Sequence, residues 1–442
     1  MNIAERVKQC GVVGAGGAGF PTHVKLQASA DTIVVNGAEC EPLLGSDRFL
    51  MERESEKLVR GTGYIMRSCS AARGYIALKE KYTEALRALR TALGDRDDIV
   101  LSILDDVYPA GDEFVLVYEI TGRIVPEGGI PPDVGCIACN VETVVNVCTA
   151  VEEEKAVTSR YLSCTGEVKT PSIVKAHIGT NLREIIELCG GPTVGDAVVV
   201  MGGPMMGRVE TDLGAPVTKT TSALIVLARD HPVIQHKTTS MEFIIRQSKA
   251  ACCQCTYCTE LCPRYLLGHD IKPHMIMRQI GYGLDVPEAV IQNALLCSEC
   301  GLCEVYACVM GLSPQVVNRR IKEMFAAAGF RPEYSGSSPE VHEMRDFRQI
   351  PTGRIQERLQ LQQFYERGLR RDLHTDPRRV EILLRQHIGG SAHPTVQQGD
   401  RVKTGTLIAE MVEDGLGSSI HASIDGMVSL IDGERIIIEK RG

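Results

Sequence analysis

The sequence predicts a multidomain protein of mixed α/β and α+β class. The chain has 442 residues, which is enough for two to four domains with cores of their own. In its first part, a β-branched strand segment and helical patterns alternate along the chain. Two runs of four cysteines then lie in a helical stretch, and short strands separated by Gly-Asp turns form the tail.

Composition excludes several classes of protein. Lys and Arg number 48 and Asp and Glu 56, a net charge of −8, which disfavours a nucleic-acid partner. No apolar run approaches the ~20 residues of a membrane span, and the start "MNIAERVKQCG" carries charges where a signal peptide would be apolar, which argues against export. We therefore expect a cytoplasmic protein, in which seventeen cysteines indicate metal binding or catalysis before disulfides.

The N-terminal segment "GVVGAGGAGFPTHVKL" contains the spacing G-x-G-x-x-G at Gly14, Gly16 and Gly19. A dinucleotide fingerprint requires a strand before this loop and a helix after it. Only two valines precede the glycines, and Pro21 follows them almost at once. Glu39 nevertheless lies twenty residues past Gly19, where a ribose-binding acid would stand. The loop alone leaves open a nucleotide site and a simple tight turn.

The first cysteine run, "CCQCTYCTELCP", has the spacing C-x2-C-x2-C-x3-C followed by proline. This is the bacterial ferredoxin pattern for a [4Fe–4S] cluster, in which the fourth cysteine serves the other of two clusters. The predicted ligands are Cys252, Cys255, Cys258 and Cys262.

The second run, "CSECGLCEVYAC", has the spacing C-x2-C-x2-C-x4-C and supplies Cys297, Cys300, Cys303 and Cys308. Its last gap is one residue longer than usual, and Val309 replaces the proline. By cross-ligation, Cys308 would complete the first set and Cys262 the second. A pair of structural zinc sites is the alternative, but zinc does not require a third thiolate at this spacing.

The segments around the cysteines predict a helical, ferredoxin-like domain. Pro287 would open one helix between the two runs. Ser313 and Pro314 would begin another, which Gly329 would terminate.

A two-cluster relay needs a source of single electrons, and a flavin converts a hydride into single electrons. Four segments of the N-terminal part supply polar groups and glycines suited to such a site: "GAGGAGFPTHVK", "NGAECEP" after the strand Thr32 to Val35, the turn "AGDE", and "NVET" leading into a helix.

These four motifs, in this order, resemble the flavin subunit of respiratory complex I and the C subunit of the Rnf electron-transport complex. The resemblance covers residues 11 to about 230 and implies a Rossmann-like FMN domain with NADH stacked over the flavin. The implied FMN site consists of Gly14, Gly16, Gly17, Lys25, Asn36, Glu39, Gly111, Asp112, Asn140 and Thr143. Phe20 and Glu41 match positions that contact NADH.

The sequence departs from this family at two places. The family's paired asparagine before "NVET" is Cys139 here, and one glutamate of the family's "GEE" turn is Asp112. Both departures concern the affinity for nicotinamide.

The remaining modules are also predicted from resemblance. "YLSCTGEVKTPSIVKAHIGTNLREIIELCGG" resembles a β-grasp module of the soluble-ligand-binding type. Arg331 to Arg385 is rich in arginine with interleaved acids, which is typical of a solvated helix face or a docking surface. The tail resembles the barrel-sandwich fold of lipoyl domains, but it has no lysine between Lys403 and Lys440 and is expected to be unmodified.

The order of modules resembles the cobalamin reductase family of propanediol-utilisation microcompartments over nearly the whole chain. The predicted boundaries are 1–155 for the FMN and NADH domain, 156–232 for the β-grasp module, 233–332 for the two-cluster domain, 333–385 for the arginine-rich helical connector and 386–442 for the barrel-sandwich module.

The resemblance implies that electrons pass from NADH through FMN and two [4Fe–4S] clusters to cobalamin, with no catalytic side chain predicted. The chain lacks the corrinoid motif D-x-H-x-x-G, so we expect cobalamin to be a transient substrate that docks near the second cluster. A cobalamin adenosyltransferase and microcompartment shell proteins would be partners. An electron-transfer subunit of a larger redox complex is the alternative, and a structural microcompartment component is a third hypothesis.

Overall fold

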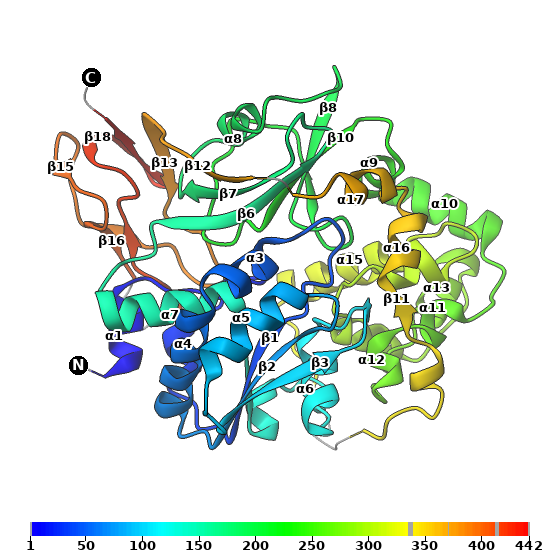
Figure 1. Ribbon diagram of the computed structural model, residues 1–442. Coiled ribbons are helices and arrows are strands. Elements are labelled where there is room, and N and C mark those ends of the chain that lie inside the picture. The colour runs from blue at the N-terminus through cyan, green and yellow to red at the C-terminus, as the bar shows by residue number, and fades with distance from the viewer. Residues whose placement is uncertain (1, 335–338, 370, 412–414, 441–442) are drawn as a thin grey trace.

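The computed structural model describes residues 2–334, 339–369, 371–411 and 415–440. Its N-terminal domain is built on a parallel four-stranded sheet with the order β3-β2-β1-β5 (Figure 1). The strands are β1 (Thr32–Gly37), β2 (Arg73–Lys79), β3 (Ile99–Leu104) and β5 (Cys136–Asn140).

Side chains along β1 alternate between two cores, as the period of a strand requires. Ile33 and Val35 pack into the larger core with α4, α5 and α7, whereas Val34 packs against α6. These helices are α3 (Ser46–Arg53), α4 (Ser55–Cys69), α5 (Thr83–Leu93), α6 (Glu113–Thr121) and α7 (Val141–Glu153). Asn36 of β1 pairs in register with Asn140 of β5, so two predicted site residues meet at the carboxyl edge of the sheet.

The β-grasp module forms a six-stranded sheet with the order β12-β7-β6-β10-β8-β9. Helix α8 (Leu182–Leu188) packs its apolar side chains against this sheet. The strands are β6 (Ser159–Gly166), β7 (Ser172–His177), β8 (Ala197–Met201), β9 (Arg208–Glu210), β10 (Ala223–Ala228) and β12 (Asp372–His374). The edge strand β12 comes from the predicted connector, so this module is completed late in the chain.

The cysteine domain is helical, as predicted. Helix α14 (Glu288–Gln292) begins directly after Pro287, and α15 (Pro314–Ala327) follows Ser313 at its N-cap. The other helices are α9 (Pro232–Lys237), α10 (Met241–Ala251), α11 (Tyr257–Glu260), α12 (Pro263–Leu266) and α13 (Pro273–Tyr282). No helix among the described residues has the length and apolar content that crossing a membrane requires.

The connector is only partly helical. Strand β11 (Ile350–Pro351) pairs with β4 (Val107–Tyr108) of the N-terminal domain. Helices α16 (Thr352–Arg358) and α17 (Gln362–Arg367) follow it. The segment therefore ties the modules together rather than standing apart as a solvated helix.

The C-terminal module consists of two small antiparallel sheets around one core of aliphatic side chains. Here the structure differs from the predicted boundary at residue 386, because β13 (Arg379–Leu383) already pairs with β19 (Arg435–Glu439). The other strands are β14 (His393–Pro394), β15 (Arg401–Val402), β16 (Leu407–Glu410), β17 (Ile420–His421) and β18 (Gly426–Ile431).

Candidate flavin and cluster sites

The glycine loop follows helix α1 (Ile3–Gln9) rather than a strand. The amide of Gly14 donates a 2.9 Å hydrogen bond to the carbonyl of Phe20, so the loop closes on itself. The amide of Ala15 donates a 2.8 Å hydrogen bond to Thr143 Oγ1 in the first turn of α7. Gly16 and Gly17 lie exposed between these anchors. The loop thus lacks the preceding strand of a dinucleotide fingerprint and presents open backbone.

Asn140 lies against the open part of this loop. A Cβ on Gly16 would lie 3.0 Å from Asn140 Cβ, whereas a Cβ on Gly17 would meet nothing within 4 Å. Asn140 is held in place, because its Oδ1 accepts from the amide of Glu142 at 2.9 Å and its Nδ2 donates to Asp47 Oδ2 at 2.7 Å. Any side chain at Gly16 would press on this fixed group.

Asn36 connects the first strand to the turn at Gly111. Its Nδ2 donates a 2.8 Å hydrogen bond to the carbonyl of Gly111. Asp112 then caps α6, accepting from the amides of Phe114 and Val115 at 2.9 and 3.3 Å. The structure thus brings three predicted flavin residues, from segments far apart in the sequence, to one edge of the sheet.

The two predicted glutamates bind backbone amides. Glu39 accepts from the amides of Asp47 and Arg48 at 2.9 and 3.2 Å, and so holds the start of α3. Glu41 accepts from the amides of Met205 and Met206 at 2.9 and 2.7 Å. Burial raises the pKa of both carboxyls, and these amide bonds oppose that rise. Glu41 therefore anchors the loop after β8 to the flavin edge.

Lys25 and Phe20 lie at the closed end of the glycine loop. Lys25 Nζ donates a 3.0 Å hydrogen bond to the carbonyl of Ala138 and lies 5.9 Å from the centre of the Phe20 ring. An ammonium group, open glycine amides and two fixed asparagine amides are donors suited to the phosphate and polar ring edge of FMN. The donor set therefore fits this cofactor.

The two cysteine loops share one backbone conformation. In the first, Gln254 and Thr256 have φ angles of 56° and 66°. At the equivalent positions of the second, Glu299 and Gly301 have φ angles of 59° and 77°. These left-handed residues turn the chain sharply between successive cysteines. The amide of Glu299 also donates to Cys297 Sγ at 3.3 Å, the kind of hydrogen bond that tunes a cluster thiolate.

The structure places the last cysteine of each run beside the other run. Burial raises the pKa of Cys258, and charge on Cys308 is the next cause. Burial likewise raises the pKa of Cys262 to about 12, with charge on Cys297 adding to the rise. The last cysteine of each run is thus close to a cysteine of the other run, and this is the pairing that cross-ligation of two [4Fe–4S] clusters would use. Within the described parts of the chain, no group of three or more His, Cys, Asp or Glu side chains is arranged to hold a single metal ion.

A π-helical turn, Cys303–Ala307, accommodates the extra residue between Cys303 and Cys308. The corresponding stretch of the first run contains the α-helical turn α11. A π-turn accommodates one extra residue, and such turns are frequent at functional sites. The departure in spacing therefore leaves Cys308 within reach of the first set.

The two thiol sets differ in exposure. In the second set, which we define as Cys297, Cys300, Cys303 and Cys262, three thiols are buried and Cys297 is partly buried. In the first set, defined as Cys252, Cys255, Cys258 and Cys308, Cys255 is exposed and the other three are partly buried.

The flavin edge and the second set are joined directly. The hydroxyl of Tyr108 donates a 2.6 Å hydrogen bond to the carbonyl of Cys300. Asp112 forms a 3.0 Å ion pair with Arg264, which lies two residues after Cys262. Sequence reasoning missed both contacts, and the only available signal was the position of these residues near the "AGDE" turn and the first cysteine run.

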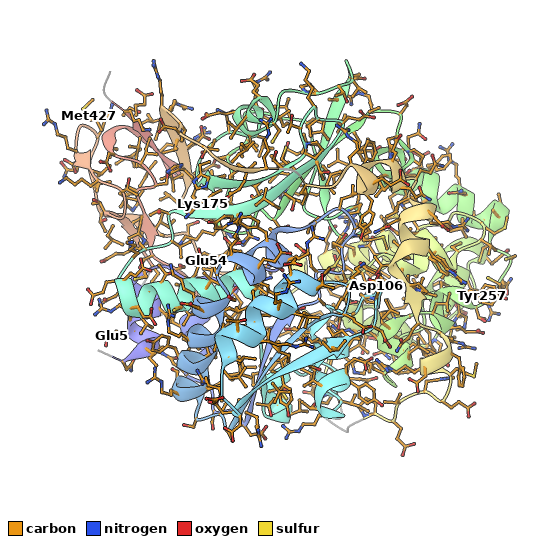
Figure 2. The ribbon with its side chains drawn as sticks, in the orientation of Figure 1. Glu5, Glu54, Asp106, Lys175, Tyr257 and Met427 are labelled. Atoms are coloured by element: carbon orange, nitrogen blue, oxygen red, sulfur yellow. The ribbon has the colours of Figure 1, made fainter. Side chains whose placement is uncertain are left out.

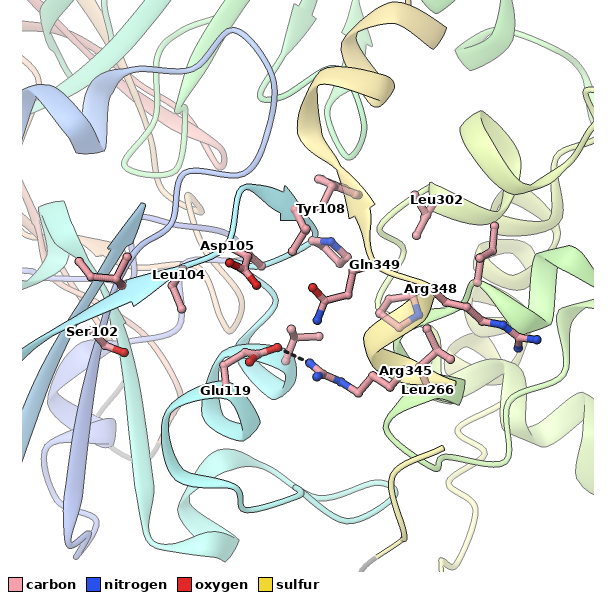
Figure 3. Close-up of a pocket in the computed structure, with 17 residues that line it drawn as sticks. Ser102, Leu104, Asp105, Tyr108, Glu119, Leu266, Leu302, Arg345, Arg348 and Gln349 are labelled. Atoms are coloured by element: carbon pink, nitrogen blue, oxygen red, sulfur yellow. Dashed lines mark hydrogen bonds and ion pairs between the residues drawn. The ribbon is translucent and has the colours of Figure 1, made fainter. Parts of the chain in front are cut away.

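A cavity of about 130 Å³ lies beside Tyr108, between the N-terminal domain and the cysteine domain. Figure 3 shows the ion pair between Arg345 of the connector and Glu119 of α6 across it. Arg348, which also lines the cavity, pairs with Glu260 at 3.1 Å. This volume is below the ~300 Å³ of ordinary ligand pockets, and it is separate from the glycine loop.

Two site residues that the sequence did not indicate are the half-buried Asp47 and the buried Arg160. Burial raises the pKa of Asp47 well above its usual range, and the charges of Glu39 and Glu142 raise it further. Arg160 donates to the carbonyl of Ala15 at 2.7 Å and so holds the glycine loop from beneath. Only the position of Asp47 shortly after "NGAECEP" could have suggested it.

Four family models match the chain. The Nuo51 FMN-binding domain matches residues 7–149, and the SLBB domain matches residues 164–209. The 4Fe-4S dicluster domain matches residues 251–313, and the RnfC barrel sandwich hybrid domain matches residues 372–441. These matches confirm the predicted fold class and the predicted cofactors, FMN and two [4Fe–4S] clusters.

The relatives extend the likeness to the full chain. A cobalamin reductase PduS of Citrobacter freundii is 44% identical over 438 residues, which is 99% of this chain and 96% of the relative. The C subunit of the Na⁺-translocating ferredoxin:NAD⁺ oxidoreductase complex of Acetobacterium woodii is 34% identical, covering 60% of this chain and 58% of that protein. A solved NAD⁺-reducing [NiFe]-hydrogenase, in the H2-reduced state, shares the fold with a TM-score of 0.50 and 21% identity, over 75% of this chain and 63% of that one.

Proposed function

The chain belongs to the family of PduS cobalamin reductases, and from this premise we propose that it oxidises NADH and reduces cobalamin. FMN, when bound, accepts the hydride and releases single electrons, which the two [4Fe–4S] clusters carry onward. One NADH supplies two electrons, and each cob(II)alamin takes one to become cob(I)alamin. The observation that carries this proposal is the direct junction between the flavin edge and the second thiol set, through Tyr108 and Arg264.

We assign the cofactor ligands from the geometry above. The first and second thiol sets would each hold one cluster. The FMN site would comprise Gly14, Gly16, Gly17, Lys25, Asn36, Glu39, Gly111, Asp112, Asn140 and Thr143. Phe20 would contact NADH, and Glu41 would do so together with the loop that it anchors, because its two oxygens already bind amides of that loop.

The test is an anaerobic assay of the purified chain with NADH and cob(II)alamin, with iron, sulfide and flavin quantified in the same sample. Cob(I)alamin forming with two cobalamins reduced per NADH supports the function. If the protein passed electrons from NADH to an artificial dye but did not reduce cobalamin, the result would contradict the proposed function.

That contrary outcome would favour the alternative, an electron-transfer subunit of a larger redox complex with a protein acceptor. The observation in its favour is the 34% identity to a protein of such a complex.

We also propose partners and a location. Cob(I)alamin is lost rapidly to water and oxygen, so a cobalamin adenosyltransferase that consumes it should bind this protein. The family resemblance supports a location for the pair within a bacterial microcompartment, beside its shell proteins. A coupled anaerobic assay checks the first point: adding the adenosyltransferase should raise the yield of adenosylcobalamin per NADH, and an unchanged yield would contradict the partnership. Co-purification of the chain with intact shells checks the second.

A further inference from the structure

Large apolar side chains lie at the surface on or beside the segments that carry the first thiol set, which is the more exposed of the two sets. We define the apolar patch by four of them, Tyr257, Tyr282, Val309 and Met310, which are 48%, 45%, 57% and 42% exposed. Figure 2 shows Tyr257 at the outer edge of the cysteine domain, at the opposite end of the molecule from Met427 of the C-terminal module.

All four side chains are tied to the first thiol set. The Tyr282 hydroxyl donates a 2.6 Å hydrogen bond to the carbonyl of Cys252, which leaves the ring at the surface. Tyr257 stands between Cys255 and Cys258 in the sequence, and Val309 and Met310 directly follow Cys308. Since Cys308 lies close to both Cys255 and Cys258, the segments that carry these side chains converge on the first thiol set.

We propose that this patch is the docking surface for the corrin ring of cobalamin during electron transfer. The inference rests on the proposed function and specifies where its acceptor binds. The corrin macrocycle is broad and flat, and two exposed aromatic rings with two aliphatic side chains offer an apolar surface on which its conjugated face can stack. A specific protein interface uses about 20–30 residues on each side, which is far more than this patch supplies.

The exposure of the thiols also supports docking at this patch. Electrons pass only over short distances, so an acceptor must approach the cluster from which it takes its electron. The second set is buried behind Tyr108 and the flavin edge, whereas Cys255 of the first set is exposed. This differs from the expectation that cobalamin docks near the second cluster. The sequence order of the two runs does not reveal which one the fold buries.

The test compares Tyr257→Glu and Met310→Glu with the control Leu430→Glu in the fully loaded protein. Leu430 of β18 in the C-terminal module is 40% exposed, close to the 42% of Met310. We expect the patch variants to raise the KM for free cob(II)alamin by about tenfold, because a carboxylate replaces an apolar contact. The control should leave the KM unchanged. Iron, flavin and the rate of flavin reduction by NADH should match the unsubstituted protein in all three.

A second measurement does not depend on turnover. Excess cobalamin should slow backbone hydrogen exchange at residues 253–257 and 309–311 in the oxidised, loaded protein, and Met310→Glu should remove this protection. Protection that appears only when an adenosyltransferase is added, or an unchanged KM in both patch variants, would overturn the assignment to the corrin. Failure of the unsubstituted protein to reduce cobalamin would instead refute the proposed function.

Discussion

Replacing Asp112 with alanine should destabilise the protein more than any exposed ion pair could. Asp112 caps α6 through two amides and pairs with Arg264 at 3.0 Å, and the two side chains are only 8% and 10% exposed. Loss of an N-cap costs about 1 kcal/mol. An unpaired buried guanidinium costs a further ~3–5 kcal/mol. The free energy of unfolding should therefore fall by about 4–6 kcal/mol.

The assay is anaerobic urea unfolding followed by circular dichroism, with Asp31→Ala as the control. Asp31 pairs with Arg123 at 2.8 Å, but these side chains are 57% and 40% exposed, so its loss should cost about 0–1 kcal/mol. The variant Asp112→Asn should keep the helix cap, and its loss of unfolding free energy should lie between those of Asp112→Ala and Asp31→Ala. Adding Arg264→Met to Asp112→Ala should recover most of the loss, because no buried charge is left unpaired. Equal, small effects of Asp112→Ala and Asp31→Ala would refute the argument.

Three further predictions concern the flavin loop, a buried lysine and the clusters. Gly16→Val should abolish FMN binding and leave iron content unchanged, because its Cβ would lie 3.0 Å from that of Asn140; unchanged flavin absorbance would make the loop a turn only. Burial lowers the pKa of Lys219 from 10.5 to about 7, so between these two pH values Lys219 is protonated in the unfolded chain but not in the folded one. Stability should therefore rise with pH above about 7, by up to ~1.4 kcal/mol per unit, and Lys219→Met should remove that slope in urea unfolding. The loaded protein should contain about eight iron atoms, and Cys258→Ala about four; stoichiometric zinc without sulfide would exclude the clusters.

Local chemistry in the sequence predicted most of the candidate sites. The cysteine spacing alone indicated two clusters, since three thiolates at x2 spacing serve a cubane. The start of α15 was predictable because serine is a preferred N-cap residue and Pro314 has a backbone suited to the first helical position. The four flavin motifs were recognised by resemblance, and their meeting at one sheet edge follows from the parallel pairing of β1 with β5.

Contacts between modules could not be predicted, because they depend on how the modules pack. The ion pair of Asp112 with Arg264 joins residues 152 positions apart. The predicted helical connector instead contributes β11 and β12 to sheets formed by earlier segments, since unpaired strand edges there need partners. The burial of the second thiol set also results from packing between modules. No local pattern distinguishes a cysteine loop that another module covers from one that stays at the surface.

The most direct test of the electron route compares the unsubstituted protein with Cys300→Ala under anaerobic conditions. Cys300 belongs to the buried second set, and its carbonyl accepts the hydrogen bond from Tyr108 at the flavin edge. NADH should reduce the flavin in both proteins, but only the unsubstituted one should go on to form cob(I)alamin. Equal cobalamin reduction by Cys300→Ala, with its loss of iron verified, would mean that the flavin reduces cobalt directly, and it would contradict the route through the clusters.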